Sequence, residues 1–362
     1  MQARIPYLLF CLLLMAGGLA AEEKVLNFYN WADYFGPDTV ADFEAEFGIK
    51  VNYDLYDSTT IVEAKLMAGR TGYDVVLQAL NYSARMMPLG VYQPLNMDKL
   101  PMRKNIDPWV LQNIGRFDPG VRYSTPYMWG TTGFVYNVKM IRERLPDAPV
   151  DSAAMIFDPE IAAHFADCGI SLLDEPTTVI PMALLYLGYD PSSIDPEHIR
   201  AAEEQLKAVR PYIRYFSSAR MLNDLPNKDI CIAMAWSGDF IQARSRIAEV
   251  GGDVELLYTI PKEGTVLWFD SLLIPHDAPH PDNAHLFLNY LMRPEVIAPI
   301  SNLTGYANAN AAAIPYLNPI LAADPLIYPP MEDRKGWEVV VIHGPKLERI
   351  RSRSWSRIKT GL

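Results

Sequence analysis

The sequence contains few of the residues from which metal sites and nucleophilic active sites are built. Histidine occurs 6 times and cysteine 3 times in 362 residues. His276, His280 and His285 fall close together in "PHDAPHPDNAH", but prolines break the helical register between the first two and no open catalytic arrangement follows. The sequence has no nucleophile elbow, phosphate-binding loop or HExxH motif. We therefore expect no metal site, no cofactor and no enzyme, and we interpret the histidines as part of a polar surface loop.

Basic residues are also in the minority. Lys and Arg number 32 against 43 Asp and Glu, which gives a net charge of −11. The one basic cluster is the tail "RIRSRSWSRIK", which could touch an acidic surface but which we interpret as a solvated terminal helix. Nucleic acid is a poor partner for this chain, because an acidic protein without a basic face repels phosphate.

Long apolar runs are missing except near the N-terminus. There Arg4 precedes "YLLFCLLLMAGGLA", a run that is too short for a membrane span and that ends in small residues. This layout is typical of a secretory signal peptide, which we predict over residues 1–21, and the product is expected to be exported. Cys11 lies inside the apolar region after Phe10, which argues against a lipid-anchored cysteine.

Removal of the signal peptide leaves two cysteines, Cys168 and Cys231. Their spacing lacks the CxxC form of a zinc site or a redox site. In an oxidising compartment such a pair favours a disulfide, and two buried thiols are the alternative.

The first third of the mature chain alternates short apolar runs with amphipathic ones, a pattern typical of an α/β fold with a mostly parallel sheet. A second series begins after the segment "RYSTPYMWGTTGFVYNV", which Pro and Gly punctuate. We predict strands or strand-like runs over residues 25–30, 49–56, 73–78, 168–174, 229–236, 254–261 and 265–275. We predict helices over residues 37–48, 58–70, 179–188, 196–210, 239–250 and 281–292.

The mature length suits two domains of ordinary size. We expect two lobes, each a mixed sheet flanked by helices, with more than one chain crossing between them. Lobe 1 is predicted to comprise residues 22–129 with 254–303, and lobe 2 residues 130–253 with 304–362. Ligands in such folds bind at the carboxyl ends of strands.

Tryptophan and aspartate recur together at or near the expected strand ends. Three separate segments carry such a pair, and a tyrosine follows in a polar loop: Trp31 with Asp33 and Tyr34, Trp236 with Asp239, Trp268 with Asp270, and Tyr306. A carboxylate that accepts a hydrogen bond from an ammonium group contributes ~1.5–3 kcal/mol. An aromatic face over the same cation adds about 0.5–2 kcal/mol. The pattern therefore predicts a site for an organic amine, since a metal ion needs ligand atoms and not aromatic faces.

These segments closely resemble the periplasmic putrescine- and spermidine-binding proteins of bacterial ABC transporters. The resemblance rests on "YNWADYF", "KLMAG", "PYMWGTTGFVYN", "SLLDEP", "ICIAMAWSGD", "IPKEG", "FDSLLIP", "FLNYLMRPEV" and "YANAN", in order along nearly the whole mature chain. It implies a two-lobed type II periplasmic-binding-protein fold that closes on a polyamine and delivers it to a membrane permease. It also implies a monomer in the periplasm and a disulfide between Cys168 and Cys231.

The same resemblance implies roles for the residues of the pattern. Trp31, Asp33 and Tyr34 match the first-lobe wall of the family's pocket. Trp236 and Asp239 match the second-lobe contribution, Trp268 and Asp270 a carboxylate-bearing strand, and Tyr306 a closing aromatic.

The sequence departs from the family at three pocket positions. Gln78 replaces a small hydroxyl residue, with Leu80 two positions on, and Thr178 stands where the family has a glutamate. Glu175 lies three residues before Thr178, where it either compensates for the lost carboxylate or is a solvated surface residue. Because Trp268 adds an aromatic face along the path of a longer cation, we predict that spermidine or another extended amine binds more tightly than putrescine.

Two other functions fit the same pattern. One is a binding protein for another amine-containing solute, or a ligand-loaded sensor that docks on a membrane receptor. The other, a minor alternative, is a periplasmic enzyme that processes amines.

Overall fold

The computed structural model describes residues 23–32, 34–56, 59–249, 251–334, 337–340 and 344–361. The predicted signal peptide and the candidate Asp33 lie outside these ranges. Within them, no helix is long and apolar enough to cross a membrane.

The predicted alternation in the first third of the chain is confirmed. Strand β1 (Val25–Trp31) runs parallel to β2 (Lys50–Tyr56) and to β3 (Val75–Ala79). Helix α1 (Thr39–Phe47) follows β1 and ends at Gly48, whose φ of 64° is a left-handed conformation that glycine adopts without strain. The crossover helices that parallel strands require thus lie where the amphipathic runs predict them.

The whole molecule is built on one curled, mixed sheet. Its strand order is β2-β1-β3-β9-β4-β7-β5-β6, and β8, β10 and β11 attach beside this path. The remaining strands are β4 (Thr125–Asn137), β5 (Ile170–Leu172), β6 (Ile213–Phe216), β7 (Ile232–Trp236), β8 (Leu256–Thr259), β9 (Val266–Leu273), β10 (Ala307–Asn308) and β11 (Glu338–Val339). This mixed α/β arrangement confirms the predicted fold class.

Strand β4 is the main feature that the sequence did not predict. The punctuated segment between the two expected series forms one strand of 13 residues, all of them buried. Its one proline and two glycines disfavour a strand interior, so the sequence marked it only as the boundary between the two series. In the structure Pro126 lies beside an irregularity in the register with β9. Gly130 and Gly133 give room to the side chains of Trp268 and Tyr258.

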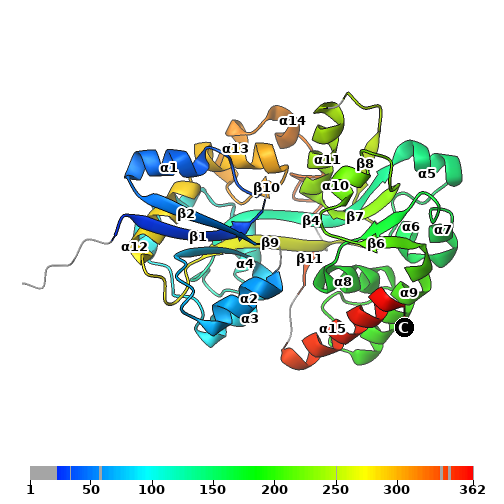
Figure 1. Cartoon of the computed structure of the whole chain (residues 1–362), viewed down its shortest axis with the longest axis horizontal. Helices are drawn as coiled ribbons and strands as arrows, with labels where there is room; N and C mark the ends of the chain where they lie inside the picture. The colour runs from blue at the N-terminus through cyan, green and yellow to red at the C-terminus, as the bar shows by residue number, and fades with distance from the viewer. Residues whose placement is uncertain are drawn as a thin grey trace, which may run out of the picture.

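Strands β4 and β9 run through the middle of the molecule and connect two hydrophobic cores (Figure 1). The first core contains Phe28, Trp129 and Phe287, and it also includes residues from Tyr306 to Ile327. The second core contains Phe134 and Phe165. Because β4 contributes to the first core up to Trp129 and to the second from Phe134, the cores meet along this strand.

Helices cover both parts of the sheet (Figure 1). Around the first core lie α1, α3 (Leu80–Met86), α4 (Pro108–Ile114), α12 (Pro281–Leu291), α13 (Pro294–Thr304) and α14 (Pro319–Ala322). Around the second lie α5 (Val138–Arg144), α6 (Ala154–Phe157), α7 (Pro159–Ala163), α8 (Pro176–Tyr186), α9 (Pro196–Val209) and α15 (Pro345–Thr360). Two smaller apolar clusters hold α2 (Thr59–Ala68) on one side, and α10 (Met221–Asp224) with α11 (Ser237–Glu249) on the other.

The predicted disulfide is confirmed. Cys168 and Cys231 are bonded and lie 63 residues apart in the chain. They immediately precede the neighbouring parallel strands β5 and β7. Closing a loop of this length stabilises a fold by about 4 kcal/mol in the chain-entropy model.

The sequence led us to expect a solvated helix for the basic C-terminal tail, but the structure buries one face of this helix. Trp355 and Ile358 of α15 are buried in the second core. Arg357 pairs with Glu203, and Lys359 pairs with Asp174. The amphipathic spacing of the apolar residues therefore buries one face of this helix, and Arg357 and Lys359 are paired with acidic residues of the same chain.

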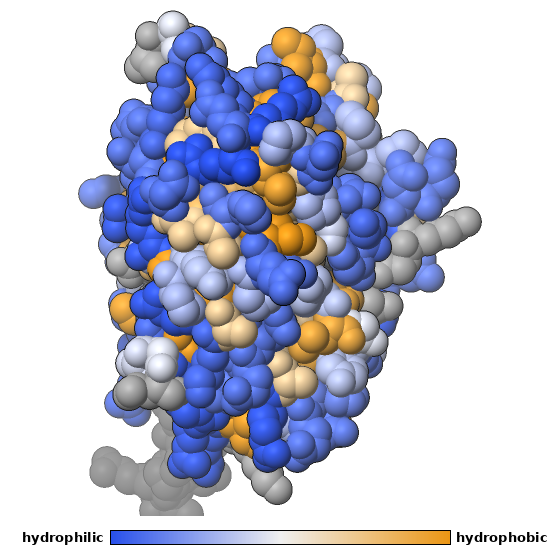
Figure 2. Space-filling model, turned by 90° about the vertical axis from the view of Figure 1, so that its right-hand side faces the viewer, coloured by the Kyte–Doolittle hydropathy of each residue, from blue (hydrophilic) through white to orange (hydrophobic). Residues whose placement is uncertain are grey.

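Figure 2 views the second-core end of the molecule, which is mainly hydrophilic with a broken strip of apolar residues, as is normal for a protein surface.

The expected polar loop of histidines is also different in the structure. His280 bonds to the buried carboxylate of Asp74, and His285 lies buried on α12, where it accepts a hydrogen bond from the backbone N–H of Asn96. Among the described residues, no group of three or more His, Cys, Asp and Glu could hold a metal ion.

Candidate ligand-binding site

Asp270 is a buried carboxylate in the middle of β9. Across the sheet Asp270 pairs with Ala79 at the end of β3, and only 8% of the residue is exposed. The Tyr34 hydroxyl donates a hydrogen bond of 2.9 Å to its Oδ2. Burial raises the pKa of Asp270 to about 7, and the hydrogen bond from Tyr34 lowers it only in part. The carboxylate is therefore costly to keep charged without a cation.

Asp239 is a second buried carboxylate, in the first turn of α11 directly after β7. Its Oδ1 accepts a hydrogen bond from the Tyr306 hydroxyl, and its Oδ2 accepts one from the backbone N–H of Trp236 at 3.3 Å. Burial raises the pKa of Asp239 to about 6, against the effect of these hydrogen bonds. A helix N-terminus favours negative charge at this place but does not replace a cation.

Neither carboxylate has a cationic partner among the described residues. The hydrogen bonds found for Asp239 and Asp270 come from tyrosine hydroxyls and a backbone N–H, and no salt bridge between described residues reaches them. The charge of Arg246 lowers the pKa of Asp239 slightly without forming an ion pair, and burial outweighs it. Burial raises the pKa values of Tyr34 and Tyr306 well above the usual range. Both hydroxyls therefore stay protonated and remain donors. Two desolvated carboxylates served only by neutral donors are suited to receive a positive charge from a ligand.

Aromatic rings enclose the two carboxylates. Tyr306 packs edge to face on Trp268 and on Tyr34, with ring centroids 5.2 Å and 5.5 Å apart. Tyr127 packs in the same way on Tyr34 and donates a hydrogen bond to the Tyr34 carbonyl. We call Tyr34, Trp268 and Tyr306 the aromatic cage. Aromatic faces attract a desolvated cation.

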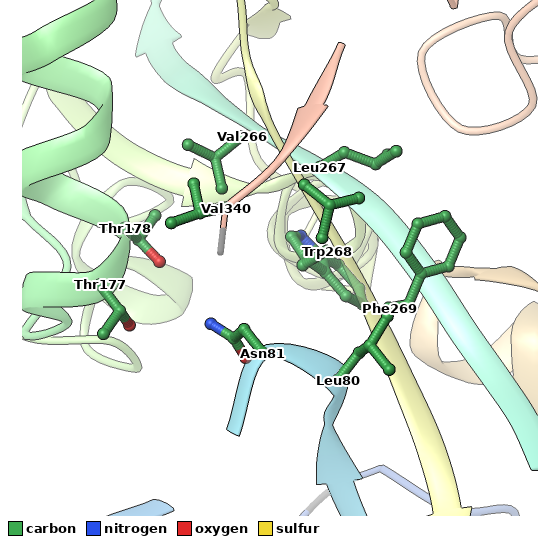
Figure 3. A pocket seen from close by; sticks show the side chains of 10 residues that line it. Leu80, Asn81, Thr177, Thr178, Val266, Leu267, Trp268, Phe269 and Val340 are labelled. Carbon is green, nitrogen blue, oxygen red and sulfur yellow. The ribbon is translucent and has the colours of Figure 1, made fainter. Parts of the chain in front are cut away.

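A narrow pocket of about 20 Å³ lies beside the cage. Asn81, Thr177 and Thr178 supply its polar wall, and their polar ends point toward one another (Figure 3). The other lining residues are Leu80, Val266, Leu267, Trp268, Phe269, Val339 and Val340. The lining thus carries no charge, and it draws on α3 and α8, which pack on different cores, and on β9 and β11.

Glu175 lies at the start of α8, where the chain contacts α3. The Tyr82 hydroxyl lies 3.1 Å from the Thr177 hydroxyl and 3.5 Å from Glu175 Oε2. Burial, and next the neighbouring charge of Asp174, raise the pKa of Glu175 to about 7. Tyr82 on α3 thus connects the two sides of the cavity.

The structure brings most of the predicted site residues together. Tyr34, Asp270, Tyr306 and Asp239 are joined by hydrogen bonds and ring contacts, Trp268 packs on Tyr306, and Trp236 donates to Asp239. Thr178 lines the adjacent cavity. Trp31 lies at the end of β1 and packs on Tyr56, 4.5 Å between ring centroids.

Gln78 is placed elsewhere. Its side chain is fully buried and bonds to the Tyr92 hydroxyl and to the sulfur of Met86, away from the cavity lining. Tyr82, Asn81 and Thr177 were not predicted. For Asn81 and Tyr82 a signal was present, since polar and aromatic residues follow directly on strand β3, as Trp31 ends β1.

The fold has two α/β parts joined by the long strands β4 and β9. Buried carboxylates and aromatic rings lie where these parts meet. This arrangement defines a two-part ligand-binding protein. The model of the family described as "bacterial extracellular solute-binding protein" matches residues 38–329. The chain therefore belongs to the bacterial extracellular solute-binding proteins, which confirms the resemblance noted in the sequence.

Individual relatives cover nearly the whole chain. The putrescine-binding periplasmic protein PotF of Escherichia coli strain K12 is 45% identical over 95% of this chain and 94% of its own length. The spermidine/putrescine-binding periplasmic protein of the same strain is 33% identical over 90% of this chain and 88% of its own. Among solved structures, a putative spermidine/putrescine ABC transporter from Listeria monocytogenes matches with a TM-score of 0.82 and 30% identity, covering 93% of this chain and 99% of that one.

The buried charge at Asp270 leads to a prediction about stability. The pKa of Asp270 in the folded protein is about 7, above the ordinary value of 3.8. The stability that depends on this group is therefore fully present below about pH 4 and is lost as the pH rises through about 7. Asp270→Asn removes the ionisation, so we expect it to raise the unfolding free energy of the ligand-free protein at pH 8 by ~1 kcal/mol or more.

Thermal denaturation at pH 8 and pH 4.5 measures this effect. The gain should be largest at pH 8 and should shrink at pH 4.5. Asp147→Asn, at an exposed position, is the matched control and should change stability little at either pH. An Asp270→Asn variant less stable than wild type at pH 8 would contradict the assignment of a costly buried charge.

Proposed function

We propose that the chain is an exported solute-binding protein that captures polyamines of the putrescine and spermidine class and delivers them to an ABC permease. The observation that carries this proposal is the pair of buried carboxylates, Asp239 and Asp270, which have no cationic partner in the described structure and lie against the aromatic cage. An organic ammonium group supplies the missing charge and suits the rings. The names of the relatives that cover the chain agree with this ligand class.

The site residues receive roles in this proposal. Asp239 and Asp270 accept ammonium groups, and Tyr34, Trp268 and Tyr306 cover the cation. Trp31 and Trp236 complete the wall near the cage. Asp33, which lies outside the described residues, keeps the wall role that the resemblance implies. Glu175 serves a further ammonium group beyond the uncharged cavity that Thr178 lines. Gln78 receives no ligand contact in this proposal, because its side chain bonds to Tyr92.

We further propose that the two cores correspond to two lobes that close on the ligand. The first core is lobe 1, for which the sequence predicted residues 22–129 and 254–303. Strand β8 pairs with β4 from Phe134 to Asn137 and packs with Phe240 of α11, so we assign β8 to lobe 2. The segment from Tyr306 to Ile327 packs in this core, so we now assign it to lobe 1 instead of lobe 2. The contact of Tyr82 with Thr177 joins α3 to α8, as expected for a closed form.

The remaining features of the proposal follow from the class of protein. We place the mature protein in the periplasm after removal of residues 1–21, as a monomer that needs no cofactor, binds no nucleic acid and has no enzymatic activity. Uptake and sensing use the same captured amine, so binding is the property to test first.

Amine binding should depend on the two buried carboxylates. Calorimetric titration with putrescine, cadaverine, spermidine and agmatine at pH 8 identifies the best ligand. Asp239→Asn and Asp270→Asn each remove a charge with little change of shape, so we expect a loss of about 1.5–3 kcal/mol, roughly ten- to hundred-fold in Kd. Asp147→Asn should bind as wild type does. If both site variants kept wild-type affinity, the proposed site would be wrong.

The preferred amine is a separate prediction. The 45% identical relative is named for putrescine and the 33% identical relative for spermidine and putrescine, whereas Trp268 and Thr178 favour a longer cation. We predict that spermidine outcompetes putrescine in a competition titration. Thr178→Glu should shift the ratio toward putrescine about tenfold or more, the equivalent of one charged hydrogen bond.

Ser352→Glu, which adds a charge on the exposed face of α15, controls for net charge and should leave the ratio unchanged. A wild type that prefers putrescine to every longer amine would refute the first part of this prediction. An unchanged ratio in Thr178→Glu would refute the second part.

A further inference from the structure

Two glycines beside the aromatic cage have no backbone reason to be glycine. Gly130 in β4 and Gly238 in α11 are absent from the residues with positive φ. Alanine can adopt their backbone conformations without strain. Gly305, by contrast, has a φ of 76° at the end of α13. The reason for glycine at the first two positions must therefore lie in the space around them.

Gly238 lies directly beneath the ring of Tyr306. A Cβ atom at this position would lie 2.3 Å from Cδ1 and 2.4 Å from Cε1 of that ring. Separations this short do not occur between non-bonded carbon atoms, so the ring would have to move.

Gly130 has the same relation to Trp268. The two residues pair across strands β4 and β9. A Cβ at Gly130 would lie 2.5 Å from Cζ2 of the indole and 2.7 Å from the hydroxyl oxygen of Ser237. An aromatic side chain that crosses a glycine on the neighbouring strand can lie flat against the backbone.

Tyr306 cannot move away without loss. Its backbone is fixed on one side by Gly305 and on the other by β10, which pairs with β4 beside Trp129. Its hydroxyl donates to Asp239, and its edges meet Trp268 and Tyr34. A displaced ring therefore breaks the hydrogen bond to Asp239 or intrudes on the cage.

We propose that Gly130 and Gly238 are positioning residues of the amine site, because they seat Trp268 and Tyr306 against the backbone and so set the width of the aromatic cage. Neither glycine touches the ligand in this account. They act through the two rings and through the Tyr306 hydrogen bond to Asp239. The consequence for amine binding depends on the proposed function, whereas the seating of the rings does not.

A mutant cycle between Gly238 and Tyr306 tests the proposal. We expect Gly238→Ala to weaken binding of the best amine at least tenfold in calorimetry. In a Tyr306→Ala background the ring is gone, and Gly238→Ala should then change the Kd less than twofold. Gly130→Ala should weaken binding in the same direction. Gly344→Ala is the matched control, since nothing lies within 4 Å of a Cβ at that glycine, and it should bind as wild type does.

Two readouts separate positioning from a general loss of stability. Losing the Tyr306 hydrogen bond, which lowers the pKa of Asp239, should move the acid-side midpoint of the affinity–pH profile to higher pH in Gly238→Ala. The same mutant cycle can be measured through the melting temperatures of the ligand-free variants, which requires no amine binding. Gly238→Ala should lower the melting temperature in wild type and have little effect in Tyr306→Ala. Wild-type affinity in Gly238→Ala would overturn the proposal. Additive effects of Gly238→Ala and Tyr306→Ala in the double variant would overturn it as well.

Discussion

The site depends on two buried carboxylates that form no ion pair within the described part of the chain. Asp239 lies in the first turn of α11 and Asp270 in strand β9, and burial raises the pKa of both, to about 6 and about 7. The cost of an ionised buried group is not offset by tyrosine hydroxyls alone. In the proposed function a bound ammonium group relieves this unfavourable charge arrangement of the ligand-free protein, so that stability is exchanged for affinity at the site.

The rest of the fold brings Asp239, Asp270 and the aromatic cage together where the two cores meet. Strands β4 and β9 pass through the region where the two cores meet, so residues of both parts reach the same site. Tyr34 and Tyr306 come from segments far apart in the chain and each donate to one carboxylate. Rings that pack edge to face make the cage rigid, which lowers the cost of ordering it when a ligand binds.

The sequence predicted the parts of this arrangement that local chemistry determines. The pairing of tryptophan with aspartate led to Asp239 and Asp270, and the compartment favoured the bond between Cys168 and Cys231. Strand β4 was not predicted because a proline and two glycines disfavour a strand interior, and the role of Gly130 appears only when Trp268 packs on it. The core position of Gln78 and the contact of Tyr82 with Thr177 depend on which distant segments meet, and no local pattern encodes that.

Proton release on amine binding tests the central claim most directly. Titration calorimetry with the best-binding amine in two buffers of different ionisation enthalpy gives the number of protons exchanged. Because an ammonium group stabilises the ionised carboxylates, binding near pH 6.5 should release protons from Asp239 and Asp270, and binding near pH 8 should release almost none. Binding near pH 6.5 without proton release, or with proton uptake, would contradict the account.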